Sequence, residues 1–273
     1  MARNHGQHFA TPVSPETTKY IDEAENKKAK RNKVISTICT VIGVILLLVS
    51  AGMWGYSQYN YHVQDVNNEK LEKFVEVPED TNKPPVVDWE GLKKQNKDVV
   101  GWIYVPGTVI NYPVYQGATN DTYLRHTADG SYGIGGQIFL DSDNEAPGMV
   151  DNQSILYGHH LKNGTMFKRI ADMDNQQMFD SIKTVWYVTE KEQYELKPLF
   201  LYLTNPNDRN VRMFDFASDE SFHEYLKKRF SKAVTSAPDA EEQIDKATHV
   251  LTLSTCNYID GSGRTELVCV PKA

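Results

Sequence analysis

The sequence predicts a mainly β protein, with a closed or nearly closed barrel of about eight strands behind one N-terminal transmembrane helix. Two observations predict this fold class. One long run near the N-terminus is apolar and contains no charged residue. Beyond Pro85, short β-branched or aromatic runs alternate with turn residues and short helical stretches, and we find no internal repeat or low-complexity tract.

The first element is the apolar run VISTICTVIGVILLLVSAGMW, residues 34–54. Its roughly 20 residues are enough to cross a bilayer as a helix. Five cations lie just before it, in residues 27–33, and predict a cytoplasmic N-terminus with the rest of the chain exported. A cleaved signal peptide is the alternative, but the run is long for a signal core and no small-x-small site clearly follows. We therefore expect a single-pass cell-membrane protein whose helix contacts lipid.

Around this helix, the chain divides into further segments. Residues 1–33 are expected to be a cytoplasmic tail, disordered through residue 26, and residues 55–85 an extracellular stalk or linker whose first part continues the helix. Residues 86–273 are expected to form the folded domain. Residues 1–54 carry seven Lys/Arg and four Asp/Glu, which leaves 22 cations and 32 anions in the remainder. An acidic exported domain argues against nucleic acid as a partner.

The folded domain begins with a short helix, DWEGLKKQNKDVV, capped by Asp88. Four short strands follow, in GWIYVPG, TVINYPVYQ, GGQIFLD and QSILYGH. The apolar spacing of MFKRIADMDNQQMFDSI fits one or two short helices. KTVWYVTEKEQYELKPLFLYLT is typical of a hairpin that turns near residues 190–192.

The last third of the domain contains one amphipathic helix and two strands. SDESFHEYLKKRFSKAV has Ser218 at its N-cap, acidic residues in its first turn and one apolar face. THVLTLSTC and RTELVCV then form two strands joined by a Gly-rich turn. With the earlier strands, these make up the expected barrel.

Three cysteines raise the question of reactivity. Cys39 lies in the apolar run, so only Cys256 and Cys269 are exported. In an oxidising setting these two could form a disulfide, whereas a free thiol outside the cell would be a sign of a reactive one. Cys256 ends an apolar strand, where side chains reach the surface, and it is the candidate nucleophile.

A cysteine enzyme also needs a proton carrier and donors for an oxyanion. Of the eight histidines, His159 and His160 follow the end of a strand, which is a common position for catalytic residues. Arg264 begins the strand after Cys256, and its guanidinium would supply fixed donors and favour a thiolate. No spaced ligand set accompanies the two histidines, so we expect neither a metal nor a cofactor.

Taken together, these residues resemble the class B sortases of Gram-positive-type bacteria, from about Trp89 to the end of the chain. The matching segments, in order, are NKDVVGWIYVPGTVINYPVYQG, NDTYL, GGQIFLD, YGHHLKNGTMF, TLSTCNY and GRTELV. The resemblance implies an eight-stranded sortase-type barrel. It also implies that the helix SDESFHEYLKKRF is the extra helix that class B enzymes place before the Cys-bearing strand.

The resemblance further implies a membrane-anchored cysteine transpeptidase with chemistry of the thiol-protease type. It would cleave a C-terminal sorting motif of surface proteins after Thr, and pass the acyl group from a thioester to the amine of a lipid II-type peptidoglycan precursor. By motif, Cys256 is the nucleophile, His159 the general acid and base, and Arg264 the stabiliser of the oxyanion or substrate.

Four further residues are implied as substrate contacts, and they are Asn120, Leu124, Tyr157 and Ser254. One position departs from the family pattern. Asn257 follows the nucleophile where class B enzymes often carry an acidic side chain, so a substrate contact from that position is in doubt.

Three other functions stay open at this point. A class B pilin polymerase would use a lysine amine as acceptor, and a cysteine protease would use water. A non-catalytic, membrane-tethered binding domain would instead keep Cys256 and Cys269 in a structural disulfide. The acceptor accepted in an assay and the reactivity of the thiol distinguish these functions from one another.

Overall fold

The computed structural model describes residues 14–256 and 263–272. The chain divides into two compact units at the Gln58–Tyr59 bond. The first contains most of helix α1 (Pro15–Glu72), a 58-residue helix with an apolar window of mean hydropathy 2.6, long and apolar enough to cross a membrane. Thr37 and Thr40 donate their hydroxyls to helix carbonyls four residues earlier, at 2.9 Å each.

Helix α1 begins earlier than we expected. Disorder was predicted through residue 26, but the helix starts at Pro15, after Ser14 accepts from the Thr17 backbone N–H. Glu, Lys and Ala dominate residues 22–33, and these residues have high helix propensity. Residues 1–13 of the expected tail lie outside the described residues.

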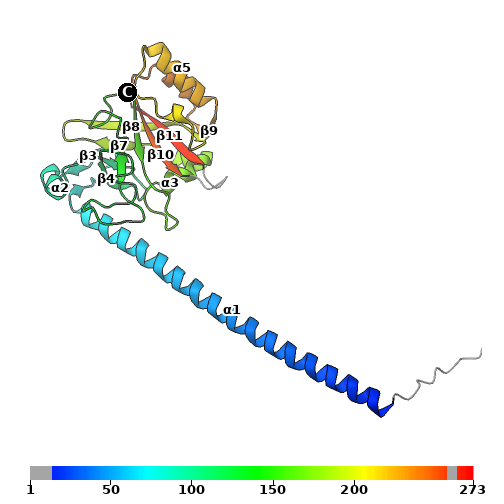
Figure 1. The fold of residues 1–273 in the computed structure, drawn as a ribbon. Coiled ribbons are helices and arrows are strands. Elements are labelled where there is room, and N and C mark those ends of the chain that lie inside the picture. The colour runs from blue at the N-terminus through cyan, green and yellow to red at the C-terminus, as the bar shows by residue number, and fades with distance from the viewer. Residues whose placement is uncertain (1–13, 257–262, 273) are drawn as a thin grey trace, which may run out of the picture. The chain divides into compact units, whose positions relative to one another are not determined.

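The second unit is built on a closed ring of eight strands (Figure 1). The strand order is β11-β10-β6-β5-β4-β3-β7-β8, and β8 pairs with β11 to close the ring. The bounds are β3 (Val99–Tyr104), β4 (Asn111–Tyr115), β5 (Ile138–Leu140), β6 (Gln153–Tyr157), β7 (Val185–Val188), β8 (Gln193–Thr204), β10 (Val250–Cys256) and β11 (Arg264–Pro271). The expected eight-stranded barrel is therefore confirmed.

Helices fill the connections between these strands, largely as predicted. Asp88 caps α2 (Trp89–Gln95) by accepting from the Gly91 N–H, and Ser218 caps α5 (Asp219–Phe230). The expected helical stretch after β6 is divided into α3 (Lys168–Ala171), the 3-10 turn η1 (Asp172–Asp174) and α4 (Gln176–Ser181). A second 3-10 turn, η2 (Arg209–Val211), and α6 (Ala240–Ile244) complete the set.

Three short strands were not predicted. β1 (Val75–Glu76) and β2 (Val86–Val87) form a small separate sheet. β9 (Ala233–Ser236) adds a ninth strand to the outer side of β8. We expected residues 233 and 234 to continue the helix, but α5 ends at Phe230, and Ala233, Thr235 and Ser236 pair with the free edge of β8.

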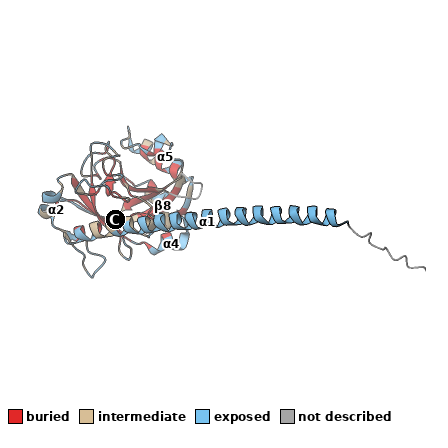
Figure 2. Cartoon of the chain, turned by 60° about the horizontal axis from the view of Figure 1, so that its bottom comes forward, coloured by how far each residue is buried: buried red, intermediate tan, exposed pale blue. Residues whose placement is uncertain are grey.

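The apolar core has three parts, and Figure 2 shows that most barrel strands are buried. The first part fills the barrel and includes Ile103, Ile138, Leu253 and Leu267. The second lies between the barrel wall and α5, whose apolar face contributes the buried side chains of Phe222, Tyr225 and Leu226. The third packs around α2 and includes Leu92, Trp102 and Tyr115.

The last turns of α1 belong to the second compact unit, which begins within the segment that was expected to be a linker. Gln64 is 1% exposed. Its side chain accepts from the Gly135 N–H and donates to the Gly136 carbonyl, both at 3.1 Å. Gly136 has φ +53°, and a Cβ there would lie 2.1 Å from the Tyr123 carbonyl oxygen, so only glycine fits.

The two hydrogen bonds between Gln64 and the Gly135–Gly136 backbone generate a stability prediction. In Gln64→Leu the Gly135 N–H and Gly136 carbonyl lose their partner inside the protein, so we expect the free energy of unfolding to fall by about 1–3 kcal/mol. Chemical denaturation of the detergent-solubilised chain measures it. Glu69→Gln, at an exposed position one turn later, is the control and should change stability by less than about 0.5 kcal/mol. Equal stability of the two variants would contradict the prediction.

Candidate active site

The candidate site lies where β6, β10 and β11 run side by side. β10 pairs in parallel with β6 and antiparallel with β11. In this register Cys256 lies opposite Arg264, and two residues earlier Ser254 lies between Tyr157 and Glu266. Because residues two apart on a strand share a face, the row Cys256–Arg264 and the row Tyr157–Ser254–Glu266 point to the same side of the sheet.

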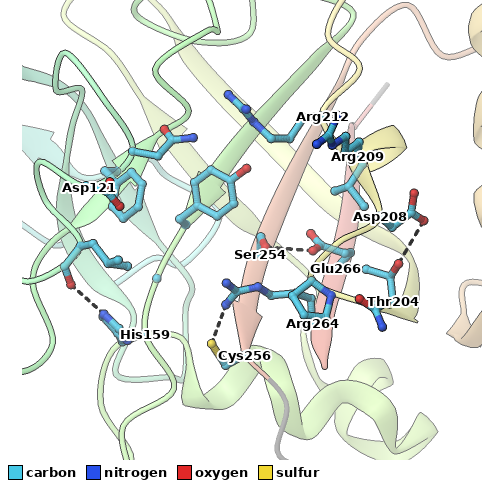
Figure 3. A pocket seen from close by; sticks show the side chains of 18 residues that line it. Asp121, His159, Thr204, Asp208, Arg209, Arg212, Ser254, Cys256, Arg264 and Glu266 are labelled. Carbon is cyan, nitrogen blue, oxygen red and sulfur yellow. Dashed lines mark hydrogen bonds between the residues drawn. The ribbon is translucent and has the colours of Figure 1, made fainter. Parts of the chain in front are cut away.

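A pocket of about 310 Å³ opens over these two rows (Figure 3). The sequence predicted seven site residues, and the structure brings all of them into its lining: Asn120, Leu124, Tyr157, His159, Ser254, Cys256 and Arg264. Further lining residues come from the loop after β8, including Asn205, Asp208, Arg209 and Arg212. This loop and the 120–124 segment form opposite sides of the pocket in Figure 3.

The thiol of Cys256 has a cationic partner. Arg264 Nη1 donates to Cys256 Sγ at 2.6 Å, and both side chains are half-buried. The short cross-strand distance between opposed residues brings the guanidinium to the sulfur. A guanidinium at a sulfur stabilises its anionic form, and its remaining N–H groups are donors for a nearby oxygen.

His159 and His160 point to different partners. His159 Nε2 donates to the Leu124 carbonyl at 2.7 Å, so in the neutral ring Nδ1 carries the free lone pair. Burial lowers the pKa of His159, and the charges of Arg125 and Arg264 lower it further, against the opposing effect of the Leu124 bond. The ring is therefore neutral at neutral pH and able to accept a proton.

His160 contacts the backbone of the candidate nucleophile. Its Nδ1 donates to the Cys256 carbonyl at 3.0 Å. His159 therefore lines the pocket, whereas His160 holds the end of β10 and is not among the described residues that line the pocket.

The other two cysteines are not disulfide-bonded, and neither is Cys256. Cys269 is fully buried opposite Leu251, and burial raises the pKa of its thiol well above the ordinary range. The structure therefore lacks the Cys256–Cys269 bond that a purely structural role would need. Among residues 14–256 and 263–272, no cluster of His, Cys, Asp or Glu has a metal-binding arrangement.

Three residues of the site were missed by the sequence analysis. Asp141 and Arg212 form a bidentate ion pair beside Tyr157, with both N···O distances 2.7 Å. Asp141 could have been suspected, because it ends the quoted run GGQIFLD at the tip of a strand. Arg212 carries no such signal, because only the folded chain brings it to Asp141.

Glu266 is the third missed residue, and its signal was a charged side chain inside the apolar run RTELVCV. It is 1% exposed and shares a 2.9 Å hydrogen bond with Ser254, while its Oε2 has no partner among the described residues. Burial raises the pKa of Glu266 to about 8, although the Ser254 bond and the charges of Arg264 and Arg229 oppose this. The carboxyl is therefore neutral at neutral pH. It does not compete with Cys256 as an anionic partner of Arg264.

The state of Glu266 predicts a pH dependence of stability. The folded pKa lies above the ordinary value of 4.5, so this group favours the folded state fully below about pH 4.5, and the effect is lost as pH rises through about 8. Glu266→Gln cannot ionise. Relative to the unmodified chain, its free energy of unfolding should rise by about 1.4 kcal/mol for each pH unit between about 4.5 and 8. Denaturation curves between pH 5 and 9 test this, and a pH-independent difference would contradict it.

The chain is similar to known proteins over most of its length. A sequence model of the Sortase domain family matches residues 103–271. Sortase B of Staphylococcus aureus is 30% identical over 247 residues, which cover 89% of this chain and 98% of the relative. The solved S. aureus sortase B–substrate complex has a TM-score of 0.60 and 31% identity, over 68% of this chain and 86% of that one.

A further solved structure, of a sortase B complexed with triglycine, has a TM-score of 0.60 and 32% identity, and the match covers 67% of this chain and 84% of that one. The family match spans the strands that carry Cys256 and Arg264 and all seven predicted site residues. The chain belongs to the sortase family, as a sortase of class B.

Proposed function

We propose that this sortase transpeptidase cleaves a C-terminal sorting motif of surface proteins after Thr, through a Cys256 thioester, and transfers the acyl group to a cell-wall precursor amine. The observation that carries the proposal is the contact between Arg264 and the Cys256 sulfur, in a pocket that also contains the His159 ring. It gives a nucleophile, an oxyanion donor and a proton carrier around one cavity.

In the first step, the Cys256 sulfur forms a bond to the carbonyl carbon of the Thr residue. His159 takes the thiol proton and returns it to the departing amine as the C–N bond breaks. A neutral ring suits the first part of this role, and the lowered pKa of His159 supports it. The products are a thioester and the free downstream peptide.

Arg264 stabilises the negative charge that develops while the thioester forms. As the sulfur attacks, negative charge moves from the sulfur to the carbonyl oxygen. A planar guanidinium that already contacts the sulfur can offer a second N–H to that oxygen without a large movement. Donors fixed in advance at a developing charge give the largest single contribution in many enzymes.

In the second step, an amine attacks the thioester carbonyl, gives a proton to His159 and displaces the sulfur. A lipid II-type peptidoglycan precursor is the acceptor that we propose. The structural likeness to a sortase B complexed with triglycine, a peptide whose free N-terminus is an amine, supports an amine acceptor. The S. aureus sortase B–substrate complex likewise supports a peptide in the pocket over Asn120, Leu124, Tyr157 and Ser254.

Mass spectrometry tests the function directly. The purified chain is incubated with sorting-motif peptides and a glycine-based amine, a lysine side-chain amine or no acceptor. We expect an acyl adduct on Cys256 and an amide product with the glycine-based amine. A product with the lysine amine alone would favour pilin polymerisation, and hydrolysis that the amines do not suppress would favour a protease.

Cys269→Ser and Cys256→Ser form a matched pair for this experiment. The buried Cys269 lies outside the pocket, so its variant should form the adduct as the unmodified chain does. Loss of the adduct only in Cys256→Ser assigns the nucleophile. An adduct that persists in Cys256→Ser would overturn the proposal.

We also propose that residues 34–54 of α1 span the cell membrane, with the N-terminus in the cytoplasm and the catalytic unit outside. The apolar window and the five preceding cations support this orientation. Protease added to intact protoplasts should therefore digest the unit beyond Trp54 and spare the N-terminal tail. Protection of the catalytic unit with loss of the tail would reverse the orientation.

The two histidines should differ in their effects. We expect His159→Ala to lower kcat by several orders of magnitude, because it removes the proton carrier from the pocket. His160→Ala should cost less, because it removes one bond to the Cys256 carbonyl, and His160→Asn should restore part of that loss. Steady-state kinetics measures kcat of all three variants. A larger loss of kcat in His160→Ala than in His159→Ala would assign the proton carrier to His160 instead.

Arg264→Lys separates charge from geometry. Lysine keeps the positive charge but loses the planar pair of donors, so we expect kcat to fall at least about tenfold, and further in Arg264→Ala. A single oxyanion donor is typically worth about 10²–10³ in rate. Circular dichroism controls for folding. Turnover close to that of the unmodified chain in Arg264→Lys would exclude the two-donor role, and in Arg264→Ala it would remove Arg264 from the site.

A further inference from the structure

Asp141 is a fully buried carboxylate that contacts three side chains of the pocket lining. It follows β5 directly and is 0% exposed, and it is absent from the set of site residues that the sequence predicted. Its two oxygens accept hydrogen bonds from four residues. One of these, the Asp143 backbone N–H at 3.0 Å, comes from its own turn, and the other three come from side chains that line the pocket.

These three side chains belong to three separate parts of the fold. Tyr157 Oη, at the end of β6, donates at 2.7 Å, and Asn120 Nδ2, in the loop after β4, donates at 3.1 Å. Arg212, just after η2, donates from Nε and Nη2 at 2.7 Å each. One carboxylate therefore ties a strand end and two loops together around the pocket.

The carboxylate is held in its charged form. Burial alone would raise the pKa of Asp141, but the hydrogen bonds from Arg212, the Asp143 backbone and Tyr157 outweigh burial and lower it. Conversely, burial and the adjacent charge raise the pKa of Tyr157 well above its ordinary value. Tyr157 is therefore a neutral phenol that donates to Asp141.

A charged carboxylate only accepts hydrogen bonds, and this fixes the direction of each bond around it. Tyr157 uses its single hydrogen on Asp141, so its remaining capacity is as an acceptor. Asn120 uses one Nδ2 hydrogen on Asp141, while its Oδ1 accepts from the Ser142 N–H at 2.8 Å. Its other Nδ2 hydrogen has no partner among the described residues, so the pair offers one acceptor and one donor.

We infer that Asp141 is a positioning residue of the sortase reaction, which orients Tyr157 and Asn120 so that this wall of the pocket recognises an amide group of the sorting peptide. A primary carboxamide carries an N–H beside a C=O, and the N–H and C=O of one residue in an extended main chain point to the same side, so either pair complements an acceptor beside a donor. The inference rests on the proposed function, because it assigns the peptide to this pocket. The recognised group is either the N–H and C=O of one main-chain residue or a side-chain carboxamide.

Arg212 makes this arrangement possible. A buried carboxylate is costly unless it is paired and hydrogen-bonded, and the bidentate guanidinium supplies both conditions. The same Arg212 Nη2 also contacts the exposed Asp143 at 2.7 Å. Asp143 is therefore a second carboxylate on the same arginine, and within the described chain its side chain is not the one that holds Tyr157 or Asn120.

Asp141→Asn and Asp143→Asn form the matched test, because the two changes remove the same charge from the same arginine. Steady-state kinetics on the full chain with a sorting-motif peptide is the readout, with thermal unfolding measured alongside. We expect KM to rise about tenfold or more in Asp141→Asn, since the bonds that orient Tyr157 and Asn120 weaken. Asp143→Asn should change KM less than about twofold.

A double-mutant cycle with Tyr157→Phe separates positioning from general damage. If Asp141 acts through Tyr157, Asp141→Asn should raise KM much less in the Tyr157→Phe background than alone. Equal increases in both backgrounds, or a lower unfolding temperature with unchanged KM, would overturn the inference. The rate of alkylation of Cys256 by iodoacetamide should be unchanged in Asp141→Asn.

Peptide analogues identify the amide. One set replaces each main-chain amide by an ester, and another replaces a side-chain carboxamide by an alkyl group of similar size. The analogue that weakens binding to the unmodified chain but not to Asp141→Asn marks the recognised amide. If no analogue does so, the amide assignment is wrong. Failure of the unmodified chain to form any Cys256 adduct is a separate outcome, which would instead overturn the proposed function.

Discussion

The register between β6, β10 and β11 is the constraint on which the site depends. A shift of one residue would turn the whole face of a strand to the other side of the sheet. In the observed register, Cys256 lies opposite Arg264 and Ser254 lies opposite Glu266 on β11. On the other side of β10, Tyr157 of the parallel strand β6 lies next to Ser254. Closure of the barrel by β8 and β11 holds this register from the far side. The strand register of the closed barrel therefore determines which side chains lie opposite each other in the site.

Two buried carboxyl groups lie beneath the same pocket in opposite ionisation states. Asp141 is charged, because a bidentate arginine and a backbone N–H compensate for its burial. Glu266 has one hydrogen bond and no bonded cation among the described residues, so burial dominates and the carboxyl keeps its proton. The two states serve the pocket differently, because a charged Asp141 fixes hydrogen-bond directions, whereas a neutral Glu266 leaves Arg264 available to the sulfur.

The sequence predicts much of the fold because its signals are local. Asp88 and Ser218 mark helix starts, the hairpin turn lies between two apolar runs, and the apolar face of α5 appears in its spacing. The gathering of His159, Cys256 and Arg264 in one pocket could be anticipated only through resemblance to a family, since their individual signals are weak. The fold then brings the three side chains into the lining of one pocket.

The features that escaped the sequence analysis all depend on contacts between distant segments. β9 forms because β8 offers a free edge, and this edge is not visible in the residues of β9. Asp141 and Arg212 are 71 residues apart, and Glu266 depends on Ser254 across a strand pair. The helix start at Pro15 is different, because local propensity was present there and the polar composition was taken for disorder.

The buried end of α1 has a consequence for how the protein can be released from a cell. Cleavage of the chain between Trp54 and Tyr59 would free a unit that keeps Gln64 against Gly135 and Gly136. Cleavage after Leu71 would leave that site open to water and remove part of the packing. In the proposed topology, a surface protease that cuts between Trp54 and Tyr59 would therefore release the second compact unit with this contact intact. The same few bonds set the earliest safe boundary for a soluble form of the protein.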